Sequence, residues 1–117
     1  MQDNLFVQDL RTKQEYKLTD SVDPIKSGVP SYAVQEEFNR YVGYWWQPVH
    51  QTNQDGSVTY RIVYEEINDE HVDLTYITPS VENEFGYDTY RYPKAGTPNS
   101  KIDLKMVELT LTDENVV

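Results

Sequence analysis

Residues 58–67 read Val-Thr-Tyr-Arg-Ile-Val-Tyr-Glu-Glu-Ile, and their pattern decides the fold class. The alternate positions form two sets, Val58, Tyr60, Ile62 and Tyr64 against Thr59, Arg61, Val63 and Glu65. Alternation in a stretch rich in β-branched and aromatic residues predicts a β-strand. A turn cluster at Asn53–Ser57 precedes this stretch, and Asn68–Glu70 turns the chain into a second strand-like run, Val72–Ile77.

Similar runs extend outward on both sides of this stretch. Residues 1–19 predict a hairpin, residues 44–77 hold the central strands, and residues 102–117 begin further strands. Residues 20–30 and 78–101 are predicted loops because they are polar and rich in proline. Strands joined in sequence by turns favour a mainly β fold, an antiparallel meander, over βαβ units.

A single helix is predicted over residues 31–42. Val34, Phe38, Tyr41 and Val42 have the spacing of one helix face. Ser31 is suited to the N-cap position and Gly43 to the position after the C-cap. Glu36, Glu37 and Arg40 lie off this apolar face.

Composition excludes several classes of function. The 117 residues contain 20 acidic and 10 basic side chains, a formal net charge of −10 that disfavours nucleic acid and membrane surfaces as partners. With no cysteine, the chain has no disulfide, no thiolate metal site and no cysteine nucleophile. Aromatic residues make up 13% of the chain, which predicts folded structure. The chain opens partway through one predicted sheet and stops where a new hairpin begins, a pattern more typical of an excised segment than of a complete domain.

No catalytic set is found. His50 and His71 lie in polar turns without a metal-ligand or nucleophile–base spacing, so solvated histidines are favoured. Gly-x-Ser-x-Gly and phosphate-binding loops are absent. Asp55–Gly56 and Asp113–Asn115 lack the ligand spacing of calcium loops and are better explained as hairpin turns. The sequence therefore predicts no catalytic residue, no metal site and no cofactor.

Two short motifs each allow two interpretations. Glu36 and Glu37, about 100° apart on a helix, can converge on one small cation such as an ammonium, which has three donors. Alternatively, Glu36 and Arg40 form an ordinary i,i+4 pair on a solvated face, which spacing alone favours. Tyr44–Trp46 can line an aromatic ligand site or fill a sheet core, and the core is favoured.

Three segments resemble one known family. Residues 35–48, Gln-Glu-Glu-Phe-Asn-Arg-Tyr-Val-Gly-Tyr-Trp-Trp-Gln-Pro, closely resemble the Glu-Glu helix and following strand of the dipeptidyl peptidase IV family, and most of all its branch with dipeptidyl peptidases 8 and 9. Residues 90–101, from Tyr-Arg-Tyr-Pro-Lys-Ala-Gly onward, are similar to a second family segment, with Ser100 where many members have proline. Residues 61–66 resemble the strand between them.

The resemblance implies both an architecture and a role. Members join an N-terminal β-propeller to a C-terminal α/β-hydrolase domain with a Ser-Asp-His triad, so this chain resembles one to two propeller blades with an inserted helix. By resemblance, Glu36 and Glu37 bind the α-ammonium of a peptide, and the parent removes N-terminal X-Pro or X-Ala dipeptides. Arg40 either holds one of the two glutamates in its rotamer without contacting the substrate, or only tunes the helix.

The resemblance also implies how the chain behaves alone. Without a catalytic triad, the chain is expected to be inactive. The alternative to a substrate-recognition segment is a self-contained acidic β module that binds a peptide or protein. Open strand edges at Leu5–Leu10 and Ile102–Leu111, and apolar faces, predict a homo-oligomer. The aromatic residues expected on those faces are Trp45, Trp46, Tyr60 and Tyr64.

Overall fold

The long strand β6 (Val58–Asn68) organises the fold in the computed structural model, which describes residues 3–77, 88–113 and 116. One edge of β6 pairs antiparallel with β9 (Lys101–Leu111) along its whole length, from Val58↔Leu111 to Asn68↔Lys101. The other edge takes three short strands in succession, β3 (Ile25–Ser27), β4 (Tyr44–Trp46) and β5 (Gln51–Thr52). An eleven-residue strand is about 36 Å long, which leaves room for all three.

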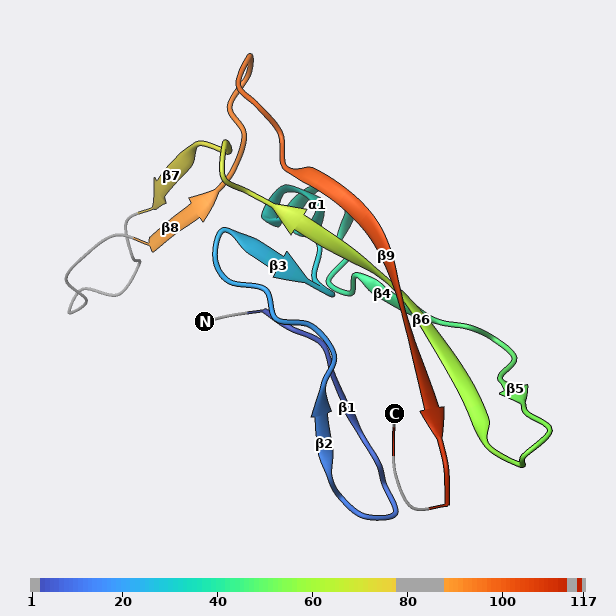
Figure 1. The fold of residues 1–117 in the computed structure, drawn as a ribbon. Coiled ribbons are helices and arrows are strands. Elements are labelled where there is room, and N and C mark those ends of the chain that lie inside the picture. Colours follow the sequence, from blue (N-terminus) through green and yellow to red (C-terminus); the bar gives the residue numbers. More distant parts are fainter. Residues whose placement is uncertain (1–2, 78–87, 114–115, 117) are drawn as a thin grey trace.

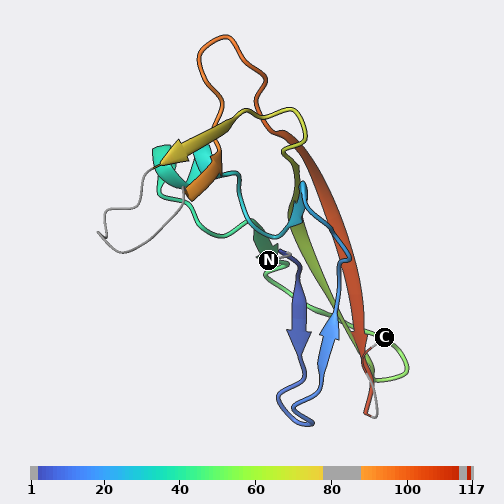
Figure 2. The same ribbon diagram turned by 90° about the vertical axis from the view of Figure 1, so that its left-hand side faces the viewer.

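Two hairpins and one helix complete the described structure (Figure 1). Strand β1 (Phe6–Gln8) pairs with β2 (Glu15–Lys17), which confirms the predicted N-terminal hairpin. Strand β7 (Leu74–Ile77) pairs with β8 (Asp88–Arg91), and α1 (Tyr32–Phe38) lies next to β8 (Figure 2). The mainly β, antiparallel class with one short helix is therefore confirmed.

The predicted meander is wrong in its order. Strands β3, β4 and β5 each pair with β6 and not with one another, and β7 leaves this sheet to pair with β8. The change of direction follows from the buried turn after β6, where the Asp69 amide donates to the Pro24 carbonyl at 3.1 Å. Ser100 Oγ also donates to Asp69 Oδ1, at 2.5 Å. These bonds hold the turn against two other segments, and both edges of β6 are occupied, by β9 and by β3, β4 and β5, so β7 pairs with β8 instead.

Both predicted loops contain a strand. Strand β3 lies within residues 20–30, and β8 lies within residues 78–101, of which 78–87 are outside the described residues. Each is only three or four residues long, too short for a period to show in the sequence. They become strands because β6 and β7 present unpaired edges to them.

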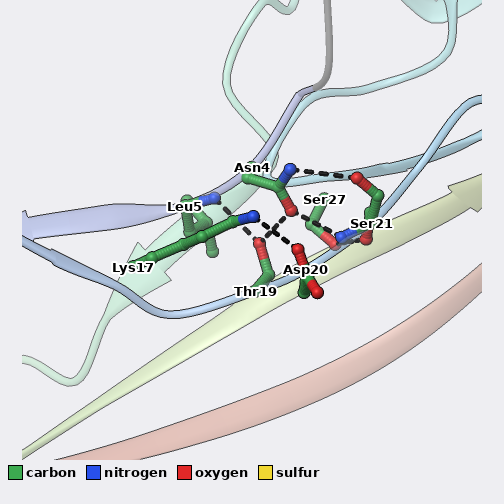
Figure 3. Close-up of polar contacts among 7 residues, drawn as sticks. All are labelled: Asn4, Leu5, Lys17, Thr19, Asp20, Ser21 and Ser27. Atoms are coloured by element: carbon green, nitrogen blue, oxygen red, sulfur yellow. Dashed lines mark hydrogen bonds and ion pairs between the residues drawn. The ribbon is translucent and has the colours of Figure 1, made fainter.

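A buried polar network joins the N-terminal hairpin to β3 (Figure 3). Asn4 Oδ1 accepts from Thr19 Oγ1 at 2.8 Å and from the Ser21 amide at 2.7 Å, and Thr19 Oγ1 accepts from the Leu5 amide at 2.9 Å. Ser21 and Ser27 share a hydroxyl–hydroxyl bond of 2.7 Å. Pairing of these groups allows polar side chains to be buried where the hairpin meets the sheet.

Figure 2 shows the same hairpin running beside the C-terminal part of β9. Arg11 Nη2 donates to the Thr112 carbonyl at 3.2 Å, which ties the hairpin tip to the end of that strand. The hairpin is thus fixed to the sheet at both of its ends.

The apolar core is small for the length of the chain. It comprises Leu5, Ile62, Tyr64, Ile67, Val72 and Leu109. The radius of gyration is 18.2 Å, against about 13 Å for a compact domain of this length. The accessible surface is 8493 Å², against about 6,600 Å² for a compact protein of this mass. The fold is elongated and leaves apolar surface uncovered.

The uncovered surface follows from strand alternation. Ile102, Leu104 and Met106 lie on one face of β9 and are 47%, 70% and 60% exposed, and Met106 is opposite Val63 in the sheet. Trp45 and Trp46 are also about half exposed, so the sequence interpretation of Tyr44–Trp46 as core is wrong. Exposure of the two tryptophans agrees with the apolar faces expected for the isolated chain. Tyr64 was expected on those exposed faces too, but it is buried. Within the described residues, no helix has the length and apolarity needed to cross a membrane.

Candidate functional site

Helix α1 is shorter than predicted. Ser31 is its N-cap, as expected, and Ser31 Oγ accepts from the Val34 amide at 3.4 Å. The helix ends at Phe38 because Asn39 adopts a left-handed conformation with φ of 52°, a conformation that asparagine tolerates better than most residues. Gly43 is therefore not the residue that follows the C-cap.

The predicted buried face of the helix is also wrong in this chain. None of the residues of α1 is buried, and Phe38 is 75% exposed. Tyr41 and Val42, beyond the helix end, are 61% and 48% exposed. Contacts at its two ends and along one side, and not burial, therefore hold α1 in place.

Glu36 and Glu37 are exposed side chains in the last turns of α1. Tyr92, just after β8, donates from its hydroxyl to Glu37 Oε1 at 2.5 Å. Tyr32, in the first turn of α1, stacks on Tyr90 with ring centroids 4.4 Å apart and also meets the Tyr92 ring edge-on at 6.1 Å. Two carboxylates and three tyrosines are thereby brought together from α1 and the β8 region.

The electrostatics of this cluster suit a cation. Donation to Glu37, together with burial and the charges of Glu37 and Glu36, raises the pKa of Tyr92. Burial and the charge of Glu36 raise the pKa of Tyr32. Both phenols stay neutral at pH 7, and Tyr92 donates its hydroxyl proton to Glu37. In residues 3–77 and 88–113, no lysine or arginine is hydrogen-bonded or ion-paired to Glu36 or Glu37.

Arg40 lies elsewhere. Its guanidinium forms two bonds with Glu65 on β6, Nη2 to Oε1 at 2.8 Å and Nη1 to Oε2 at 3.0 Å, and this pairing raises the pKa of Arg40. Because the helix has already ended at Phe38, Arg40 does not occupy the i+4 position above Glu36. The interpretation of Glu36 and Arg40 as an i,i+4 surface pair is therefore wrong, and within the described residues the hydrogen bonds of Arg40 go to Glu65 and to the Val42 carbonyl.

A cavity of about 260 Å³ opens beside Glu37. Its lining is mostly apolar and includes Val34, Glu37, Phe38, Pro93 and Ile102. The arrangement can therefore hold a small cation at Glu37 with an apolar group next to it.

Comparison with known proteins identifies the family. The family model for the dipeptidyl peptidase IV N-terminal region matches residues 1–117. The chain belongs to this family. It is 34% identical over 116 residues to mouse dipeptidyl peptidase 8, covering 92% of this chain, and 34% identical over 119 residues to the human protein, covering 95%. It spans only 13% of the length of each of these relatives.

The other residues considered from the sequence lie away from this site. His50 and His71 are exposed, the first 5.5 Å from the Tyr60 ring and the second 3.8 Å from Glu70. Asp55 Oδ1 accepts from the Ser57 amide and hydroxyl at 3.0 and 2.6 Å, the geometry of a turn, and these bonds lower the pKa of Asp55. Within the described residues, no group of three or more acidic or histidine side chains is placed to hold a metal ion.

Sequence reasoning missed three residues of this region. Tyr92 lies within residues 90–101, which resemble a family segment, but the sequence indicated no role for its side chain. Tyr32 precedes the predicted pair by one helical turn, a spacing that indicates a shared face. Glu65 was assigned only to a strand pattern, and nothing local to it indicates its partner Arg40, which is 25 positions earlier in the chain.

Proposed function

We propose that this chain is the substrate-recognition segment of a serine peptidase of the dipeptidyl peptidase IV family that removes X-Pro or X-Ala dipeptides from peptide N-termini. Glu36 and Glu37 bind the α-ammonium of the substrate. The observation that carries the proposal is the cluster itself: two adjacent, exposed carboxylates beside the neutral donor Tyr92, with no basic partner among the described residues. The relatives are named dipeptidyl peptidases, in keeping with this role.

The chemistry of the pair fits an ammonium. A protonated amine has three donors, and each hydrogen bond to a carboxylate is charge-assisted. Two neighbouring carboxylates repel each other, and a cation between them relieves that repulsion. Binding needs ionised carboxylates and a protonated amine, whose ordinary pKa is about 7.7–8.0. Fixing the amine at one point places the bond after the second residue at a set distance, which selects dipeptide release.

The uncovered apolar face of β9 and β6 is suited to packing between neighbouring sheets, as in one to two blades of a β-propeller. The parent's α/β-hydrolase domain supplies the nucleophile, so this chain alone is inactive. The alternative, a self-contained acidic module that binds a peptide or protein, is disfavoured by the small core and the elongated shape.

Charge removal in the full-length protein tests the proposal. Glu36→Gln and Glu37→Gln keep the side-chain shape but remove one charge each. Each should lower kcat/KM for Ala-Pro-nitroanilide roughly 10- to 150-fold, as expected for loss of a hydrogen bond between charged groups. Glu15→Gln, an exposed glutamate on β2, is the matched control and should have no effect.

A substrate with a blocked amine separates binding from folding. It never contacts the pair, so its slow hydrolysis should be the same in the wild type and in both variants. Equal losses on free and blocked substrates would show a folding defect, and unchanged kcat/KM on the free substrate would refute the ammonium site.

A further inference from the structure

The position of α1 depends on contacts at its ends. At the N-terminal end, Gln35 Nε2 donates to the Pro30 carbonyl at 3.0 Å, next to the Ser31 cap. Along one side, Tyr32 and Glu37 contact the tyrosines near β8. Since α1 buries none of its residues, its location relative to the central sheet is set by the buried segment before it, residues 28–31, and by the segment that follows it, residues 39–43.

One ion pair attaches that segment to the sheet. The Glu65 side chain is 8% exposed and receives two hydrogen bonds from Arg40, while Arg40 Nη1 also donates to the Val42 carbonyl at 3.1 Å. The guanidinium carbon lies 5.7 Å from the centre of the Trp45 ring, within cation–π range. Arg40 thus links its own loop, β4 and β6 at one point.

The backbone around this pair is closely packed. The Gly43 amide donates to the Gly28 carbonyl at 3.0 Å, the Glu65 amide to the Gly43 carbonyl at 2.8 Å, and the Gly28 amide to the Glu65 carbonyl at 2.9 Å. A Cβ at Gly43 would lie 2.9 Å from Glu65 Oε2. The carboxylate therefore fits into a space that only glycine leaves open.

We propose that Glu65 is a positioning residue for the α-ammonium site: by fixing Arg40, it fixes where α1 presents Glu36 and Glu37. This inference rests on the proposed function. When Glu65 loses its charge, the guanidinium of Arg40 stays half-buried without an opposite charge. This destabilises the position in which residues 39–43 lie over β6. The carboxylate pair then samples a range of positions, and an ammonium must select the productive one.

A double-mutant cycle in the full-length peptidase tests the inference. Glu65→Gln, Arg40→Gln and the double variant are assayed with Ala-Pro-nitroanilide. Each single change should raise KM about tenfold with kcat within about twofold, because the ammonium contact is made equally in the ground and transition states. The double variant should also stay near tenfold, since both changes break the same link.

The adjacent strand residue provides a matched control. Glu66 also forms an ion pair, with Lys105 at 2.8 Å, but its side chain points to the opposite face of β6 from Glu65. Glu66→Gln should leave KM unchanged, since it makes the same chemical change on the same strand without touching Arg40.

The outcomes distinguish failure of the positioning role of Glu65 from failure of the α-ammonium site itself. If Glu65→Gln behaves like Glu66→Gln, or if the double variant shows about a hundredfold rise in KM, the positioning role is overturned. If Glu65→Gln does not fold, Arg40→Lys replaces it: this change keeps the charge of the pair but loses the two-point contact, and a wild-type KM would overturn the role. Glu36→Gln is measured alongside, and if it too leaves KM unchanged, the proposed function fails and not the positioning inference alone.

Discussion

Gly43→Ala should destabilise the chain, and the structure gives the size of the effect. The new Cβ would lie 2.9 Å from Glu65 Oε2, 3.0 Å from the carbonyl carbon of Val29 and 3.1 Å from that of Gly28. Gly43 is not in the left-handed region, so the obstacle is space and not backbone strain. The carboxylate is held by Arg40 and the other two atoms are backbone, so none of them can move freely.

Two opposing effects set the magnitude. Overpacking of this kind costs about 1–3 kcal/mol. Alanine restricts the unfolded chain and returns about 0.4–1 kcal/mol. We therefore expect a net loss of about 1–2 kcal/mol in the free energy of unfolding.

Urea unfolding followed by tryptophan fluorescence measures this loss, because Trp45 and Trp46 lie in the strand that follows Gly43. With a slope of about 1.5 kcal/mol per molar urea, the midpoint should fall by about 1 M. In a Glu65→Ala background the closest contact is removed but both backbone contacts remain, so the cost of Gly43→Ala should shrink without vanishing. A wild-type midpoint for Gly43→Ala would refute the close approach, and an unchanged cost in the Glu65→Ala background would show that the carboxylate is not an obstacle.

Four further predictions follow from the same contacts. The 117-residue chain should not hydrolyse Ala-Pro-nitroanilide. Turnover that a serine-directed inhibitor abolishes would contradict the proposal that the parent's hydrolase domain supplies the nucleophile. Tyr92→Phe in the full-length peptidase should lower kcat/KM about two- to tenfold through loss of the bond to Glu37, and should have no further effect in a Glu37→Gln background. Hydrogen bonds from Arg11 lower the pKa of Asp9 below its ordinary value near 3.9, so their stabilisation is present above that pH and is lost as pH falls through the folded-state pKa. Thermal midpoints between pH 2 and 6 should therefore drop less steeply for Asp9→Asn than for the wild type. The isolated chain should form a homo-oligomer through the apolar face of β9, despite a net charge of −10, because 0.15 M salt screens charges beyond about 8 Å; a monomer by light scattering at every salt concentration would contradict this.

The sequence determined those features that are recorded locally. Alternation along residues 58–67 is enough to predict β6, because a strand with one buried face needs a period of two. The hairpin in residues 1–19 and the cap at Ser31 are likewise specified by residues close together in the chain. The Glu36–Glu37 motif indicated the family, which the comparison confirmed.

The tertiary structure alone decided which partners these residues have. Strand β3 exists because an edge of β6 is available, and Glu65 meets Arg40 because residues 39–43 fold back over β6. The asparagine that ends α1 at Phe38 moves Arg40 off the helix, so a spacing that predicted a pair with Glu36 gave the wrong partner. Helical spacing sets neighbours only as long as the helix continues. Once it ends, long-range packing and the pairing of buried charges determine which side chains meet.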